Sequence, residues 1–168
     1  MMDYKKQFKD ILQYILSNSK ANKSWINTYF AELKQLSTTE RGEVAEQFLE
    51  SVLKPLNFEV KRAGSKRDSY DILINNKKIE VKQATLDVNS SFQFNGIRYH
   101  RDYDFLFVLG VSPEEIFFNI YTAADVKTQK IGKLIAMEKG VVGSHKLTKK
   151  PSELYNINLL KEVILKNL

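Results

Sequence analysis

The strongest constraint in this sequence is a pair of short apolar segments separated by a polar turn. Residues 72–83 form this pattern around a tight turn at 75–78, which is typical of a β-hairpin. Side chains alternate along a strand, so Glu80 and Lys82 share one face. An antiparallel hairpin also brings Asp71, at the start of the first segment, near them. We therefore expect two carboxylates and one ammonium group to converge.

Converging carboxylates repel each other unless a cation lies between them. Hard oxygen ligands suit magnesium, and a lysine beside such an ion can orient a water or offset charge on a phosphate. The residues alone leave a second interpretation open. Glu80 and Lys82 could simply form cross-strand ion pairs on a solvated hairpin face.

The order of these residues favours the first interpretation and leaves the second open. Asp71 followed by Glu80–Val81–Lys82 resembles the signature of the PD-(D/E)XK nucleases. This superfamily includes many type II restriction endonucleases, archaeal Holliday junction resolvases and DNA repair nucleases. One departure is that Tyr70 stands where the name-giving proline usually stands.

The resemblance extends upstream of the hairpin. Residues 42–46, Gly-Glu-Val-Ala-Glu, look like the G-x-x-x-E helix that precedes the core in many members. This match favours Glu46 as an additional acid, with Glu43 as the second choice. Residues 62–65, Arg-Ala-Gly-Ser, look like the linking segment of the resolvases.

The resemblance implies both a site and a reaction. It implies a magnesium-dependent DNA endonuclease, with manganese as a possible substitute for magnesium. The metal ligands would be Asp71, Glu80, the backbone carbonyl of Val81 and Glu46, and either one or two ions could act. Lys82 would position the attacking water, and the products would carry a 5′-phosphate and a 3′-hydroxyl.

The expected fold class is α/β. By resemblance it is a restriction-endonuclease-like sandwich, with a central four- to five-stranded mixed sheet flanked by helices and an N-terminal helical pair. Apolar spacing predicts that pair at residues 3–18 and 24–36, and a third helix capped by Ser37. We divide the single domain into an N-terminal extension (1–37), a catalytic core (38–126) and a C-terminal segment (127–168).

Further strands and one further helix are expected in the core and the C-terminal segment. Strands are predicted at 58–63, 103–111 and 116–121, and Thr122 is expected to cap a short helix. A closing helix is predicted at 159–165. The region 130–151 is interrupted by three glycines, and its pattern predicts neither one helix nor one strand.

The segment after the hairpin is a candidate for reading DNA. Phe92 and Phe94 alternate with two amides, Gln93 and Asn95, and Arg98 follows. Amide and guanidinium groups can recognise adenine and guanine in the major groove. The alternative is an edge strand whose polar face meets water. Five further cations are expected to contact phosphates: Lys61, Arg62, Lys66, Arg67 and Arg101.

Composition agrees with a nucleic-acid partner but does not demand one. The net charge is +6, which leans toward a polyanion. The absence of cysteine excludes disulfides and thiolate metal sites. The sequence contains no apolar run typical of a secretory signal or a membrane span, so we expect a cytoplasmic protein.

Three functions remain open from the sequence. The first is sequence-specific restriction of double-stranded DNA. This would involve a homodimer, since one chain carries one site, and a cognate DNA methyltransferase that acts on the same site. The second is a Holliday-junction-resolving or DNA repair nuclease. The third is a non-catalytic nucleic-acid-binding module, against which the intact Asp71, Glu80 and Lys82 set argues.

Overall fold

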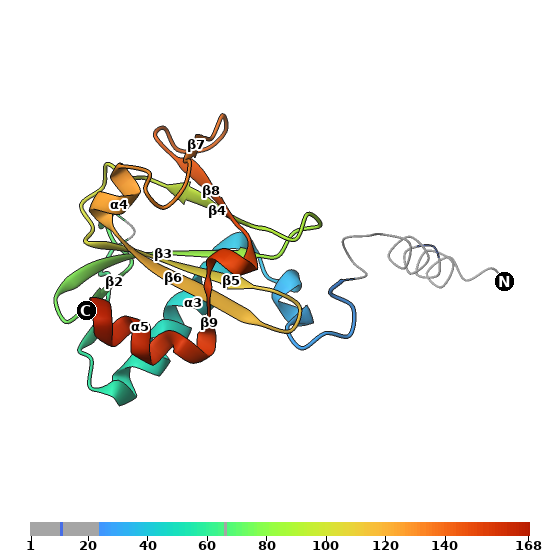
Figure 1. The fold of residues 1–168 in the computed structure, drawn as a ribbon, viewed down its shortest axis with the longest axis horizontal. Coiled ribbons are helices and arrows are strands. Elements are labelled where there is room, and N and C mark those ends of the chain that lie inside the picture. Colours follow the sequence, from blue (N-terminus) through green and yellow to red (C-terminus); the bar gives the residue numbers. More distant parts are fainter. Residues whose placement is uncertain (1–10, 12–23, 66) are drawn as a thin grey trace.

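The computed structural model describes residue 11, residues 24–65 and residues 67–168. A six-stranded mixed sheet forms the middle layer. The helices Thr38–Leu53 and Leu160–Asn167 cover one face, and a second, three-stranded sheet lies on the other face together with the short helix Ala123–Lys127 (Figure 1). The elements, with η for a 3₁₀ helix, are η1 (Ala31–Gln35), α3 (Thr38–Leu53), η2 (Lys54–Leu56), β1 (Val60–Arg62), β2 (Ile72–Ile74), β3 (Lys77–Thr85), β4 (Phe92–Ile97), β5 (Phe105–Val111), β6 (Ile116–Thr122), α4 (Ala123–Lys127), β7 (Ile135–Ala136), β8 (His145–Lys149), η3 (Pro151–Glu153), β9 (Tyr155–Asn156), η4 (Ile157–Leu159) and α5 (Leu160–Asn167).

The predicted hairpin is formed by β2 and β3. Ile74 pairs with Lys77, so only Asn75 and Asn76 make the turn. Their φ angles are 47° and 64°, the left-handed values that a type I′ turn requires and that asparagine tolerates well. This turn matches the right-handed twist of the two strands and fixes their register.

The large sheet has the order β1-β2-β3-β5-β6-β9, in which only β3 and β5 are parallel. The sheet is mixed, as expected, but the expected four to five strands are too few. The additional edge strand, β9, has only two residues. A strand this short has no periodicity that a sequence could reveal.

The central strand β5 is buried on both faces, as its unbroken apolar sequence predicts. Phe107 and Leu109 face a core shared with α3 and α5. Leu106 and Val108 face a second core shared with β4 and β8. This strand therefore holds the two layers of the molecule together.

The three-stranded sheet has the order β4-β8-β7, and two of its strands, β7 and β8, come from the region that fitted no single element. Its position depends on one close approach. A Cβ added to Gly110 of β5 would lie 2.8 Å from Cδ2 of the fully buried Phe92 in β4. Only glycine at this position lets the phenyl ring lie directly on the backbone of the large sheet.

The third predicted helix is confirmed as α3, and its start follows the predicted capping box. The Ser37 hydroxyl accepts from the Glu40 backbone N–H at 3.2 Å, and the Glu40 carboxylate accepts from the Ser37 backbone N–H at 2.7 Å. Thr122 caps α4 and the closing helix is α5, both as predicted.

Only the second member of the predicted N-terminal helical pair falls within the described residues. The first member, residues 3–18, lies outside the described residues apart from residue 11. The second member, residues 24–36, is wrong, because only the 3₁₀ helix η1 forms there. Asn27 adopts a φ of 55°, which interrupts any helix, while Trp25 inserts into the core. No helix in the described part of the chain has the length and apolar character of a membrane span.

The contact between Gly110 and Phe92 gives a stability prediction. Gly110→Ala should lower the free energy of unfolding by about 1–3 kcal/mol, since the added methyl forces the buried ring to move. Gly42→Ala in α3 is the matched control. Its methyl meets nothing within 4 Å, so it should stabilise the helix by about 0.4–1 kcal/mol. Urea titration of both variants measures the difference. Equal effects at the two positions would contradict the packing described here.

Candidate active site

The β2–β3 ladder opens at Asp71, and this opening creates the site. The backbone N–H of Asp71 still donates to the Ile79 carbonyl at 2.9 Å. The next amide of β3, that of Val81, instead donates to Oδ2 of Asp71 at 2.7 Å. The Asp71 carboxylate thus replaces a backbone acceptor and is held against β3 at the point where the two strands separate.

Glu80 and Lys82 share one face of β3, as the alternation predicts. Nζ of Lys82 lies 2.6 Å from Oε1 of Glu80, and the side chains are 19% and 1% exposed. Oε2 of Glu80 is buried without a hydrogen bond among the described residues. It has an ion pair with Nη1 of Arg101 at 3.7 Å. A carboxylate buried this deeply requires cations close by.

Tyr103 borders this buried pair. Burial, and next the negative charge of Glu80, raise the pKa of the Tyr103 phenol to about 12, so the ring carries its proton. Its hydroxyl also has no hydrogen-bond partner among the described residues. Arg101 is fixed from the other side, because its guanidinium donates to the backbone carbonyl of Asp68. The Glu80 end of the site is therefore enclosed by Tyr103 and Arg101.

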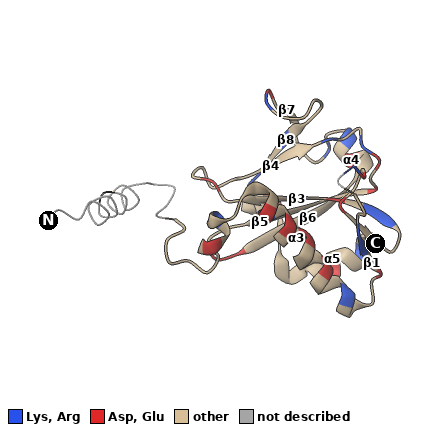
Figure 2. Ribbon diagram, turned by 180° about the vertical axis from the view of Figure 1, so that it is seen from behind, with Lys and Arg blue, Asp and Glu red and all other residues tan. Residues whose placement is uncertain are grey.

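A second acidic group reaches the site from α3, along which acidic residues are spaced (Figure 2). Arg62 of β1 joins two of these residues, with Nη1 2.6 Å from Oε1 of Glu43 and Nη2 2.5 Å from Oε2 of Glu46. Burial raises the pKa of Glu46, Arg62 opposes this rise, and the charge of Asp71 adds to it. Both Glu43 and Glu46 therefore contact Arg62, so the structure does not choose between them as the additional acid.

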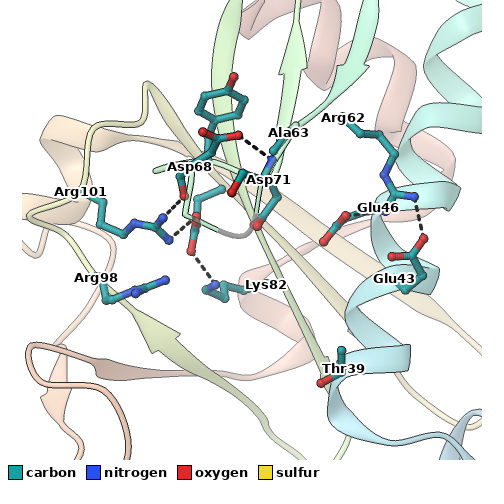
Figure 3. A pocket seen from close by; sticks show the side chains of 13 residues that line it. Thr39, Glu43, Glu46, Arg62, Ala63, Asp68, Asp71, Lys82, Arg98 and Arg101 are labelled. Carbon is teal, nitrogen blue, oxygen red and sulfur yellow. Dashed lines mark hydrogen bonds and ion pairs between the residues drawn. The ribbon is translucent and has the colours of Figure 1, made fainter.

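These groups surround one open pocket of about 490 Å³. Figure 3 shows Lys82, Arg98 and Arg101 on one side, Asp71 in the middle, and Arg62 with the two α3 acids on the other side. The pocket therefore brings together all four side chains expected to act in catalysis: Asp71, Glu80, Lys82 and Glu46.

The donor chemistry of Asp71 and Glu80 fits a magnesium ion. Both supply hard oxygen ligands, and Oε2 of Glu80 is a buried oxygen that lacks a hydrogen bond among the described residues. A set of three acids is not assembled, however. Residues 24–65 and 67–168 contain no group of three or more acidic or histidine side chains that could hold a metal ion as they stand. Glu46 instead faces Arg62.

The residues expected to contact DNA fall into separate places. Three of the arginines line the pocket: Arg62, Arg98 and Arg101. Gln93 and Asn95 border a different hollow, on the small sheet. Lys61 and Arg67 are exposed and do not line the pocket, and Lys66 lies outside the described residues.

Thr39 and Asp68 line the pocket, although the sequence had singled out neither of them. Thr39 lies on α3 four residues before Glu43 and seven before Glu46, so helical spacing places all three on one face. Applying the helical period to polar residues would have found Thr39. Asp68 reaches the pocket through the loop before β2, and no pattern in the sequence indicates this.

Comparisons with known proteins add little to this geometry. No family model matches the chain, and no curated protein is significantly similar to it. Among solved structures, a bacterial homing endonuclease, I-Ssp6803I, is similar with a TM-score of 0.47 and 15% identity, over 77% of this chain and 96% of that one. A likeness this weak carries no argument about fold or function, so both rest on the geometry above.

The Arg62 bridge gives a prediction about stability and pH. Arg62→Ala should lower the free energy of unfolding by about 1–3 kcal/mol at neutral pH, because the half-buried Glu46 loses its partner. The deficit should shrink as the pH falls. Burial raises the pKa of Glu46 in the folded state, so protonation there removes the unpaired charge.

Lys61→Ala is the matched control, because Lys61 lies next to Arg62 on β1 and also has an acidic partner. Lys61 pairs with Glu59 at 2.6 Å, but both side chains are mostly exposed. Its removal should leave the free energy of unfolding unchanged within error. Denaturant titrations at several pH values compare the variants. An Arg62→Ala deficit that does not vary with pH would show that Glu46 is not the group left unpaired.

Proposed function

We propose that this protein is a magnesium-dependent endonuclease that hydrolyses phosphodiester bonds in DNA. The observation that carries the proposal is the deeply buried Glu80 carboxylate, which shares a pocket with Asp71 and Lys82 and has one oxygen without a hydrogen bond to any described residue. A structural ion pair on a solvated face would expose these groups. Here they border an open pocket that three arginines flank.

Each residue has a role that follows from its position. Asp71 and Glu80 would hold the magnesium ion, with the Val81 carbonyl as a further ligand and Glu46 available once it leaves Arg62. The bound ion would supply charge stabilisation at the scissile phosphate and lower the pKa of a water. Lys82 would donate a hydrogen bond to the attacking water and offset the developing phosphate charge.

The reaction consumes one water for each bond cut. A bond forms between the water oxygen and the phosphorus, and the bond from phosphorus to the 3′ oxygen breaks. Solvent takes up the proton of the water and supplies the proton of the leaving 3′-hydroxyl, so the 5′-phosphate remains on the other fragment. Arg98 and Arg101, which line the pocket, would hold the flanking phosphates.

We further propose that the substrate is double-stranded DNA and that cleavage is sequence-specific, as in restriction. The exposed amides of Gln93 and Asn95 on the small sheet support sequence reading rather than shape reading. A double-strand cut by one site per chain needs a second copy, so we propose a homodimer. A restriction enzyme would also need a methyltransferase that protects the same site in the host DNA.

The first functional test is the metal requirement. Purified protein should cut plasmid or phage DNA with magnesium or manganese, and calcium should support binding without cutting, because calcium coordinates more loosely. Discrete fragments would indicate restriction, and a smear would indicate nonspecific activity. A preference for four-way junctions would indicate a resolvase. Undiminished cutting in excess chelator would refute the proposed metal site.

The second test concerns Lys82. Lys82→Ala should lower the cleavage rate by at least about 10²-fold, the scale of one lost electrostatic or acid–base contribution. Affinity for DNA should change far less, because other cations still meet the phosphates. Lys161→Ala is the control, since Lys161 is an exposed lysine of α5 and does not line the pocket. If Lys82→Ala cuts DNA at the rate of the parent protein, the ion pair between Lys82 and Glu80 has only a structural role.

A further inference from the structure

The outer face of the three-stranded sheet is built from side chains that can hydrogen-bond to bases. Gln93 of β4 lies directly opposite Thr148 of β8, and antiparallel partners point to the same side. The next pair, Phe94 and Leu147, is buried against the large sheet. The outer face therefore carries the residues that alternate with this pair.

We define the outer face by five residues. Lys146 precedes Leu147 and pairs with Ile135 of β7, so both belong to this face. Gln93, Asn95, Ile135 and Lys146 border one shallow hollow of about 440 Å³. The outer face is thus Gln93, Asn95, Ile135, Lys146 and Thr148.

We propose that this outer face reads base-pair edges in the major groove of duplex DNA. The inference rests on the proposed nuclease function and assigns the sequence-reading residues within it. The major groove admits a β-ribbon of this kind. Its chemistry matches base edges as well: amides suit adenine, a lysine suits guanine, and the methyl-bearing Ile135 and Thr148 suit the methyl group of thymine.

Gln93 is already oriented for this role. Its amide nitrogen donates to Oδ2 of Asp87 at 3.0 Å, which fixes the side-chain amide. One amide hydrogen and the carbonyl oxygen remain, and these are the two groups that a bidentate contact to adenine uses. An amide fixed in advance loses less conformational freedom on binding. We therefore expect at least one A·T pair in the recognised sequence.

The outer face is polar rather than aromatic, which favours duplex DNA over a single strand. Proteins that hold single strands stack bases on aromatic side chains. The aromatic residues of β4, Phe92 and Phe94, are fully buried, and none of the five outer-face residues is aromatic. Lys139 and Lys146 line the hollow together with one acidic residue, Glu138, so its charged side chains leave a net positive charge for the flanking phosphates.

The outer face is continuous with the cleavage pocket along β4. One extra residue is inserted near Gly96, because β4 advances from Phe94 to Ile97 while β8 moves only from Leu147 to His145. Gly96 has a φ of 75°, which suits glycine in such a bulge. Arg98, directly after β4, lines the cleavage pocket.

This continuity predicts how far the cut lies from the bases that are read. Asn95 and Arg98 are three residues apart, so with the bulge at Gly96 between them they are separated by at most about 10 Å of chain. That length spans about three base pairs. We therefore place Arg98 with the cleavage pocket, and we expect the scissile phosphate about three base pairs from the bases that Asn95 contacts.

The test uses the full chain with Lys82→Ala, which still binds but does not cut, in calcium. Selection from a randomised duplex library should yield a sequence preference that includes an A·T pair. Adding Gln93→Ala, Asn95→Ala or Thr148→Ala should each relax a different position of this preference. Affinity for the selected duplex should fall by about 5- to 150-fold, the equivalent of one lost base contact. Affinity for unrelated duplexes should stay within about twofold of the starting protein, as expected when phosphate contacts are intact.

Matched controls come from the opposite side of the large sheet. Asn158→Ala and Lys161→Ala remove exposed polar groups from η4 and α5, so they should leave the sequence preference unchanged. Circular dichroism and the affinity for unrelated duplexes report whether each variant is folded. Because three variants on two strands test the same outer face, one misfolded variant does not remove the test.

The outcomes separate this inference from the proposed function. A sequence preference that survives all three outer-face substitutions would overturn the inference while leaving the nuclease intact. Cleavage with no sequence preference, or with a preference for single strands or four-way junctions, would also overturn it. A protein that neither binds nor cuts DNA would refute the proposed function itself.

Discussion

The hydrogen bond from the Val81 amide to the Asp71 carboxylate determines the geometry of the site. Without it, β2 would have to supply a backbone acceptor at this level, and the two strands would continue side by side. The 2.7 Å contact lets them separate and keeps the amide satisfied. Glu80 and Lys82 border a pocket at this separation, and the pocket also reaches α3. One side chain thus ends a sheet ladder and places a carboxylate where a cation would bind.

The pocket contains opposing charges in close balance. Lys82 and Arg101 offset the buried Glu80, and Arg62 offsets Glu43 and Glu46. This balance explains how several acids can lie near one another while no group of three among the described residues is ready to hold a metal. A bound cation would compete with Arg62 for Glu46. Released from that carboxylate, the guanidinium would be free to meet a phosphate, as the sequence first indicated.

Local rules in the sequence predicted the elements of the site. Alternation and the Asn75–Asn76 turn fix which side chains of the hairpin converge, and the Ser37 capping box fixes where α3 begins. Contacts between segments that are distant in the sequence could not be predicted. Whether Arg62 binds an acid or a phosphate depends on the distance between β1 and α3, which no local pattern encodes. The partnership of β4 with β8 is equally hidden, since it joins segments about 50 residues apart across irregular chain.

The bulge in β4 has a consequence for how such a chain could diverge. In a regular strand without the bulge, Gly96 rather than Ile97 would face the core. The side chain of Arg98 would then point to the opposite side of the sheet. The one inserted residue therefore determines how Arg98 at the pocket is oriented relative to the side chains of the outer face. If the outer face reads bases and the pocket cuts, as proposed, loss or gain of one residue here would shift the offset between recognised bases and cut phosphate by about one base step. Relatives that differ only at this point could share a recognition sequence and leave different DNA ends.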